Sequence, residues 1–65
     1  MTIRTVQQTD RTRIDRISDR YHAEYALYLD SSYYSTFPTM NDAEHEAAVW
    51  LDEQAQRLAV YEVAA

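Results

Sequence analysis

Hydrophobic and polar residues alternate along the segment RYHAEYALYLD, which ends at Asp30. In an extended chain one face would carry Tyr21, Ala23, Tyr25, Leu27 and Leu29, and the other His22, Glu24, Ala26, Tyr28 and Asp30. A period of two with several tyrosines favours a half-buried strand. A helix is the alternative, because Tyr21, Tyr25, Tyr28 and Leu29 also fit a period of 3.6.

The residues that follow favour the strand. Asp30, Ser31 and Ser32 are turn formers. The next segment, YYSTF, is rich in aromatic and hydroxyl residues that suit a returning strand. We therefore predict two antiparallel strands joined by a short turn.

The segment NDAEHEAAVWLDEQ has a helical pattern instead. At 100° per residue, one face collects Ala43, Ala47, Trp50, Leu51 and Gln54. Pro38 disfavours helical geometry at Phe37, and either Thr39 or Asn41 can act as the N-cap. Asn41 followed by Glu44 resembles a capping box. We predict a helix over residues 41–56 that packs on the sheet, with Trp50 contributing most of the buried area.

The two ends of the chain complete the predicted fold. LAVYEVA favours a third strand from about Leu58 to Val63, and TIRTVQ could be an edge strand. Thr9 is a good N-cap candidate, and Ile14 with Ile17 gives a thin apolar stripe, so we predict a short helix over residues 10–19. The predicted fold class is α+β: one domain, residues 1–65, with a small antiparallel sheet of about three strands against one main helix.

Composition limits what such a domain can be. A chain of 65 residues buries only about 60% of its unfolded surface, so its core is small. Cysteine is absent, which excludes disulfides and thiolate metal sites, and the absence of glycine excludes phosphate-binding Gly-rich loops. No stretch approaches the roughly 20 apolar residues of a membrane span, and no apolar segment follows the N-terminal arginines. We expect a soluble cytoplasmic protein without membrane contact.

Candidate catalytic groups are sparse. His45 stands between Glu44 and Glu46, but adjacent helical residues point about 100° apart and cannot converge on one metal. His22 and Glu24 could touch across one strand face, yet a catalytic or metal site needs further groups and a pocket. The serines do not stand in a nucleophile-elbow or catalytic-triad motif. The acids do not have the alternating spacing and central glycine of a calcium-binding loop. We expect no enzyme activity, no metal and no cofactor.

Charge is distributed unevenly along the chain. Residues 1–20 contain five arginines and three aspartates, and residues 21–65 contain one arginine and eight acids, so the balances are +2 and −7. On the predicted helix Asp42, Glu46 and Glu53 lie within about 40° of each other, beside Asp52. Such an array could occupy a groove that normally holds a nucleic-acid backbone. The alternative is ordinary solvation of a helix exterior.

Six tyrosines provide the second candidate surface. One helix covers only one face of a sheet, so Tyr28, with Tyr33 or Tyr34, could lie exposed for partner contact; a tyrosine-rich core or cross-strand ladder is the alternative. The negative charge opposes direct nucleic-acid binding by stacking. The predicted partner-binding residues are Asp42, Glu46, Val49, Asp52 and Glu53, with Glu24, Tyr28 and Asp30 near the strand ends.

In size, acidity, absence of cysteine and lack of catalytic motifs, the chain resembles small phage-encoded inhibitors, including acidic anti-CRISPR proteins. The resemblance is carried by the −7 balance of residues 21–65 and by Asp42, Glu46 and Glu53. It implies a non-enzymatic protein that binds a basic nucleic-acid-binding effector in the host cytoplasm, whereas the five N-terminal arginines depart from a uniformly acidic mimic. The alternative is a small homodimeric accessory protein that uses a tyrosine-rich sheet face, so both monomer and homodimer remain open.

Overall fold

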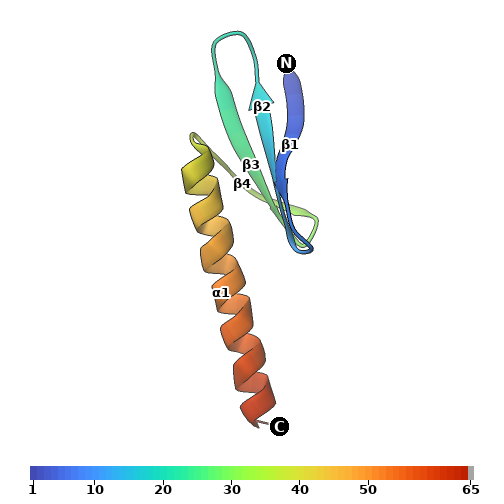
Figure 1. The fold of residues 1–65 in the computed structure, drawn as a ribbon, viewed down its shortest axis with the longest axis vertical. Coiled ribbons are helices and arrows are strands. Elements are labelled where there is room, and N and C mark those ends of the chain that lie inside the picture. Colours follow the sequence, from blue (N-terminus) through green and yellow to red (C-terminus); the bar gives the residue numbers. More distant parts are fainter. Residues whose placement is uncertain (65) are drawn as a thin grey trace.

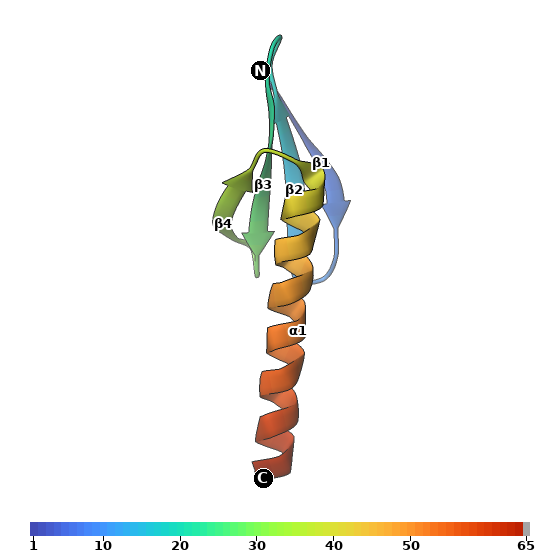
Figure 2. The ribbon, with the colours of Figure 1, turned by 90° about the vertical axis from the view of Figure 1, so that its left-hand side faces the viewer.

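The fold is a four-stranded antiparallel sheet followed by one long helix (Figure 1). The computed structural model describes residues 1–64, with side chains described through Leu58. The elements in chain order are β1 (Thr2–Gln8), β2 (Thr12–Ser18), β3 (Ala23–Leu29), β4 (Ser32–Phe37) and α1 (Met40–Ala64). Each strand pairs with the next along the chain, so the sheet order is β1-β2-β3-β4. The helix lies over one face of the sheet (Figure 2).

The α+β class and the helix on an antiparallel sheet are confirmed. The edge strand near the N-terminus, the alternating strand and the returning strand are observed as β1, β3 and β4. The short helix over residues 10–19 is wrong, because residues 12–18 form the strand β2. Ile14 lies opposite Leu27 and Ile17 opposite Glu24, so the two isoleucines project from opposite faces of the sheet. The sheet therefore has four strands rather than about three.

The strand predicted over residues 58–63 is also wrong, because the backbone of α1 continues to Ala64. Val and Tyr favour strands locally, but propagating an established helix by one residue costs less than starting a new element. The chain has no glycine, and its one proline precedes the helix, so the usual stop signals are missing. At the other end Thr39, not Asn41, is the N-cap, since its hydroxyl accepts a hydrogen bond from the Asp42 amide at 3.2 Å.

The β3–β4 turn stores backbone strain at two residues. Asp30 has φ of 50° and Ser31 has φ of 67°, both in the left-handed region that favours glycine. The turn needs this conformation because two-residue hairpin loops match the twist of their strands only with positive φ.

Replacing Ser31 with glycine is expected to raise the free energy of unfolding by about 0.5–1 kcal/mol, because glycine adopts positive φ without a Cβ clash. Urea unfolding followed by circular dichroism measures the change. The same substitution at Ser18, which lies in β2 and has no positive φ, is the control and should destabilise the fold. A decrease in stability for Ser31→Gly would contradict the assignment of strain to this turn.

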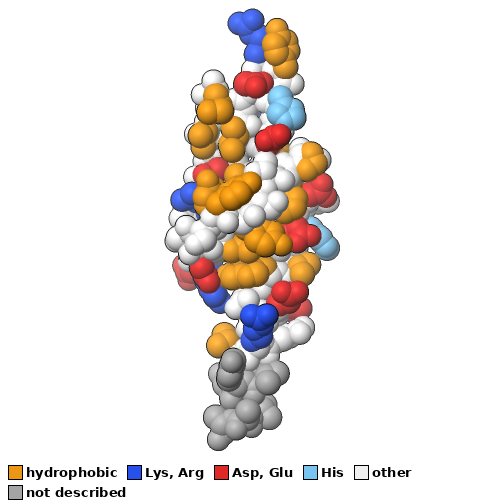
Figure 3. Space-filling view, turned by 180° about the vertical axis from the view of Figure 1, so that it is seen from behind, with side chains coloured by type: hydrophobic (Ala, Val, Ile, Leu, Met, Phe, Trp, Pro, Cys, Tyr) orange, Lys and Arg blue, Asp and Glu red, His pale blue; other side chains and the backbone are white. Residues whose placement is uncertain are grey.

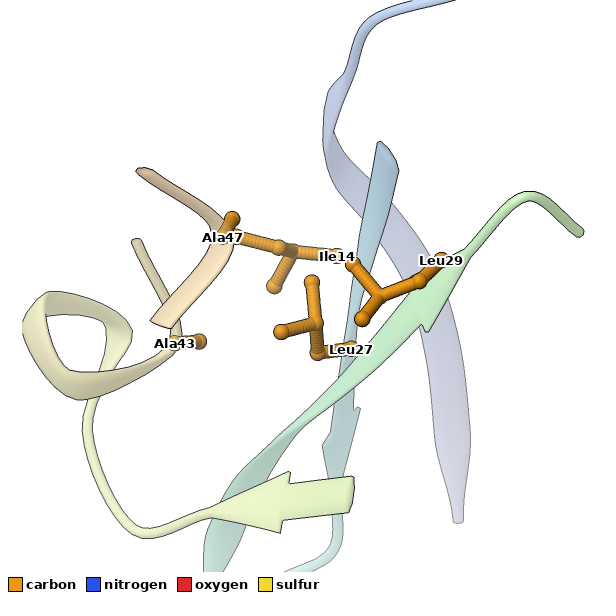
Figure 4. Packing of buried hydrophobic residues seen from close by; sticks show 5 residues of the cluster. All are labelled: Ile14, Leu27, Leu29, Ala43 and Ala47. Atoms are coloured by element: carbon orange, nitrogen blue, oxygen red, sulfur yellow. The ribbon is translucent and has the colours of Figure 1, made fainter. Parts of the chain in front are cut away.

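The core lies between α1 and the middle strands (Figure 4). Its buried members are Ile14, Leu27, Leu29, Ala43 and Ala47, and Tyr25, Phe37, Met40 and Trp50 pack around them. The two alanines let the helix approach the sheet closely, while the larger side chains come from the strands. The predicted apolar helix face is thus confirmed for Ala43, Ala47 and Trp50.

Candidate partner-binding surfaces

The acidic strip, which we define as Asp42, Glu46 and Glu53, lies on one flank of α1. Helical geometry places it about 90° around the axis from Ala43, Ala47 and Trp50, the residues that pack on the sheet. Asp42 and Glu53 are exposed and Glu46 is half-buried. Val49 borders the strip and is 40% exposed, so it adds an apolar contact point among the carboxylates.

The net charge of the chain lies in one of the two layers of the structure, the helix, and not in the sheet. Residues 1–39 contain five arginines and five acids and are therefore neutral, while residues 40–65 contain six acids and one arginine. The helix segment thus carries the whole charge of −5. This division is sharper than the one between residues 1–20 and 21–65, because Glu24 and Asp30 belong to the sheet layer and balance its arginines.

Among the described side chains, residues 1–58, the ion pairs leave the acids in the first part of α1, up to Glu53, unmatched. They join Arg11 to Asp30, Arg13 to Asp15 and His22 to Glu24. None of these pairs uses an acid of α1; Asp52 accepts a hydrogen bond from the neutral Gln56 amide at 3.0 Å. The field of the helix carboxylates is therefore directed to solvent rather than neutralised internally.

Asp30, a predicted partner-binding residue, has an intramolecular partner. The Arg11 guanidinium donates two hydrogen bonds to its carboxylate, at 2.9 and 2.7 Å, and this holds the pKa of Asp30 below its usual range. The same guanidinium lies 4.8 Å from the centre of the Trp50 ring. Arg11, in the β1–β2 turn, thus contacts both the β3–β4 turn and the helix. The Asp30 carboxylate is used in this intramolecular contact.

Glu24, a second predicted residue, pairs with His22 across 2.9 Å on the face of the sheet away from α1. Its hydrogen bond and its charge raise the pKa of His22. Below pH 6.5, about the pKa of histidine in the unfolded chain, the protonated His22 imidazole contributes fully to the stability of the folded state. This contribution is lost as the pH rises through the higher pKa that His22 has in the folded state.

Replacing Glu24 with glutamine is expected to lower the pKa of His22 toward the ordinary histidine value, because it removes the carboxylate that favours the imidazolium. The titration of the His22 ring protons by NMR measures the shift. Glu44→Gln is a control with the same chemical change at an exposed helix position. An unchanged His22 titration in Glu24→Gln would show that the pair does not form in solution.

The open face of the sheet carries an ordered row of side chains. The Arg13 guanidinium lies 4.1 Å from the Tyr28 ring centre, and the Tyr28 and Tyr33 rings meet edge to face at 5.8 Å. The Tyr33 hydroxyl is 2.6 Å from that of Thr36. Tyr28 is half-buried by these contacts, whereas Tyr33 and Tyr34 are 59% and 54% exposed. Apart from this open face, the side of the molecule seen from behind in Figure 3 has hydrophobic side chains gathered in its middle.

The eight predicted residues therefore do not form one surface. Five lie on α1, which covers one face of the sheet: Asp42, Glu46, Val49, Asp52 and Glu53. Glu24 and Tyr28 project from the opposite face, and Asp30 lies in the β3–β4 turn. The helix residues alone form a continuous candidate surface.

Sequence reasoning did not find two cationic features. Arg4 and Arg16 are directly opposite each other on β1 and β2, and both are exposed. Arg11 contacts Trp50 and Asp30. The pattern Thr12, Ile14, Arg16 could have placed Arg16 beside a core residue, but only if residues 12–18 had been recognised as a strand.

The described residues contain no group of three or more His, Asp or Glu side chains that could hold a metal ion. No helix in the part of the chain that the structure describes is both long and apolar enough to cross a bilayer. Comparison with protein-family models, curated proteins and solved structures finds no match to this chain. The functional proposal therefore depends on the charges and contacts of this chain.

Proposed function

We propose that this protein is a non-enzymatic inhibitor that binds a basic, nucleic-acid-binding effector through the acidic strip of α1 and blocks its nucleic-acid site. The observation that carries the proposal is the concentration of the whole net charge of −5 on one helix segment. The ion pairs of residues 1–58 do not use these acids. A fixed array of carboxylates speeds association with cationic partners.

The spacing of the strip supports mimicry of a phosphate backbone. At a rise of about 1.5 Å per residue, Asp42 and Glu46 are about 6 Å apart along the axis, and Glu46 and Glu53 about 10.5 Å. Phosphates on one DNA strand advance about 3.4 Å each along the duplex axis, so the strip repeats its charges on a similar length scale. A basic groove that accepts a strand could therefore accept these carboxylates in its arginine and lysine sites.

The helix holds the strip at low entropic cost. Thr39 caps the first turn, and Ala43 and Ala47 pack that part of the helix on the sheet, so Asp42 and Glu46 project from an anchored backbone. A pre-ordered array loses less conformational entropy on binding than acids on a flexible segment. The resemblance to small phage inhibitors indicates an RNA-guided effector as one member of the partner class.

Affinity capture from a lysate of the source organism at low salt tests this proposal. The immobilised chain is expected to retain basic nucleic-acid-binding proteins, and moderate salt should release them because the contacts are between exposed charges. Asp42→Lys/Glu46→Lys, immobilised in parallel, should retain much less of the same proteins. Retention of the same proteins by both chains would overturn the proposal.

A further inference from the structure

The strand β1 forms one edge of the sheet, and the helix does not cover it. Its only strand neighbour within the described chain is β2. The helix packs on β2, β3 and β4 and, within the described chain, makes no contact with β1 (Figure 2). All seven residues of β1 are exposed. An edge strand presents unpaired N–H and C=O groups that another strand can join, so β1 is open to a partner from its side and from both faces.

The hydrogen bonds of the β2–β3 hairpin determine which residues of β2 bond to β1. The pairs Asp30–Arg11 and Asp19–His22 each form a backbone hydrogen bond, at 2.8 and 2.9 Å, at the two ends of the unbroken β2–β3 register. Bonded and unbonded pairs alternate along an antiparallel ladder. The odd-numbered residues of β2 therefore bond to β3, and the even-numbered residues bond to β1.

The free backbone groups of β1 are therefore those of Ile3 and Thr5. Arg4 is opposite Arg16, an even-numbered residue, and these two form a bonded pair. Ile3 and Thr5 are opposite odd-numbered residues that bond to β3, so their N–H and C=O groups point away from the sheet. The register then shifts at a bulge after Thr5, and a bulge turns an edge away from further pairing. The usable edge is residues 2–5, which contain neither proline nor lysine.

The helix side of this edge is cationic. Arg16 is opposite Tyr25, which packs at the core, so Arg16 and its partner Arg4 project from the helix side. Asp15, the one carboxylate in the sequences of β1 and β2, projects from the other face. Neither arginine forms an ion pair within residues 1–58. Like charges directly opposite on neighbouring strands repel, so this pair favours an anionic partner.

The charges favour a different protein over a second copy of this chain. Pairing β1 with β1 of a second copy would bring Arg4 and Arg16 of both copies onto one face, with no acid of these strands among them. An acidic strand would instead match the two arginines. Residues 1–39 are neutral in total, so the sheet layer does not repel such a strand. The other edge, β4, is a poorer site because a bulge interrupts its pairing with β3.

We propose that β1 binds an extended acidic segment of a partner protein, which joins the sheet as an additional strand antiparallel to β1. Its backbone bonds to the N–H and C=O groups of Ile3 and Thr5. The partner residues opposite Arg4 and Thr2 are acids on the helix side, and the residue between them is apolar and packs on Ile3, which is 59% exposed. This site goes beyond the proposed function, does not depend on it, and leaves the acids of α1 free.

Titration of the full chain with synthetic peptides tests this site. One peptide alternates glutamate and valine, and a second has the same composition with the glutamates and valines in separate blocks. The alternating peptide should bind saturably and at least about 10-fold more tightly than the block peptide. It should also slow hydrogen exchange of the Ile3 and Thr5 amides, measured by NMR, because these amides then donate to the peptide. The Arg4 amide, which already bonds to β2, should exchange at an unchanged rate.

Two variants separate the charge from the backbone contribution. Arg4→Glu/Arg16→Glu should raise the dissociation constant of the alternating peptide by at least about 30-fold. Its matched control, Arg20→Glu/Arg57→Glu, makes the same change in net charge at exposed positions outside β1 and should change the constant by less than about 3-fold. Ile3→Pro removes an edge N–H but no bond to β2, so it should bind at least about 10-fold more weakly than Ile3→Ala.

Three results would overturn the inference. They are the absence of saturable binding, equal binding of the two peptides, and undiminished binding by Arg4→Glu/Arg16→Glu. Edge amides of β1 that are protected without peptide and lose protection on dilution would assign the edge to a second copy, and would also overturn it. Asp42→Lys/Glu46→Lys should bind the alternating peptide as the wild-type chain does, so failure of this site and failure of the proposed function are distinguishable.

Discussion

Replacing Leu27 with alanine is expected to lower the free energy of unfolding by about 3 kcal/mol, enough to unfold a large fraction of the protein. Leu27 has no exposed surface and lies beside its cross-strand partner Ile14 on the helix side of the sheet, so the truncation leaves a cavity in the only hydrophobic cluster of the described core (Figure 4). Leu→Ala substitutions at such sites cost about 2–5 kcal/mol. A single small core of this kind supplies only about 3–5 kcal/mol in total.

Urea unfolding of Leu27→Ala beside Ile3→Ala measures this effect. Ile3 is 59% exposed on β1, and its truncation removes a similar volume from the surface instead of the core. We expect a loss below about 1 kcal/mol for this control, in the range of surface substitutions. Equal losses for the two variants would contradict the assignment of the core to the region between α1 and the middle strands.

Reversing the charge of two strip residues is expected to weaken binding of the captured effector by about 30-fold, or about 2 kcal/mol. Asp42→Lys/Glu46→Lys replaces two attractions by two repulsions at positions that the packed first half of the helix holds in place. The loss should shrink as salt is added, because screening weakens contacts between exposed charges. Titration calorimetry at two salt concentrations measures both the affinity and its salt dependence.

The matched control is Asp10→Lys/Glu44→Lys, which changes the net charge by the same amount at exposed positions outside the strip. Glu44 is about 180° around α1 from Glu53, so it tests the location of charge rather than its total. The control should retain nearly all of the affinity. Equal losses in the two double variants would show that net charge alone attracts the partner and that the strip has no special role.

Local patterns predicted the elements whose signals are complete within one segment. The alternation of β3 was sufficient because Tyr25, Leu27 and Leu29 on one face pack at the core beneath the helix. On the other face Glu24 and Tyr28 stay half-buried, although Ala26 between them is buried. The apolar helix face and the acidic strip could be found for the same reason, since both depend only on positions within one helix. The turn at Asp30 and Ser31 was recognised from its residue types, although its positive φ angles required the structure.

Predictions failed where the outcome depends on contacts between distant segments. β2 was mistaken for a helix because Ile14 and Ile17 have helical spacing, and the neighbouring strands β1 and β3 that stabilise it are not visible in its own residues. The end of α1 was misplaced because no stop signal follows residue 56. The pairing of Arg11 with Asp30, 19 residues apart, and the Arg4–Arg16 neighbours follow from strand register, which one sequence does not fix.

Competition between this protein and nucleic acid for the captured effector tests the central claim most directly. A fluorescently labelled nucleic-acid ligand bound to the effector is titrated with the wild-type chain, and its anisotropy is followed. Displacement should bring the anisotropy down to that of the free ligand, whereas Asp42→Lys/Glu46→Lys should displace little at the same concentration. An anisotropy that stays constant or rises, as in a ternary complex of effector, nucleic acid and this protein, would contradict occupation of the nucleic-acid site by the acidic strip.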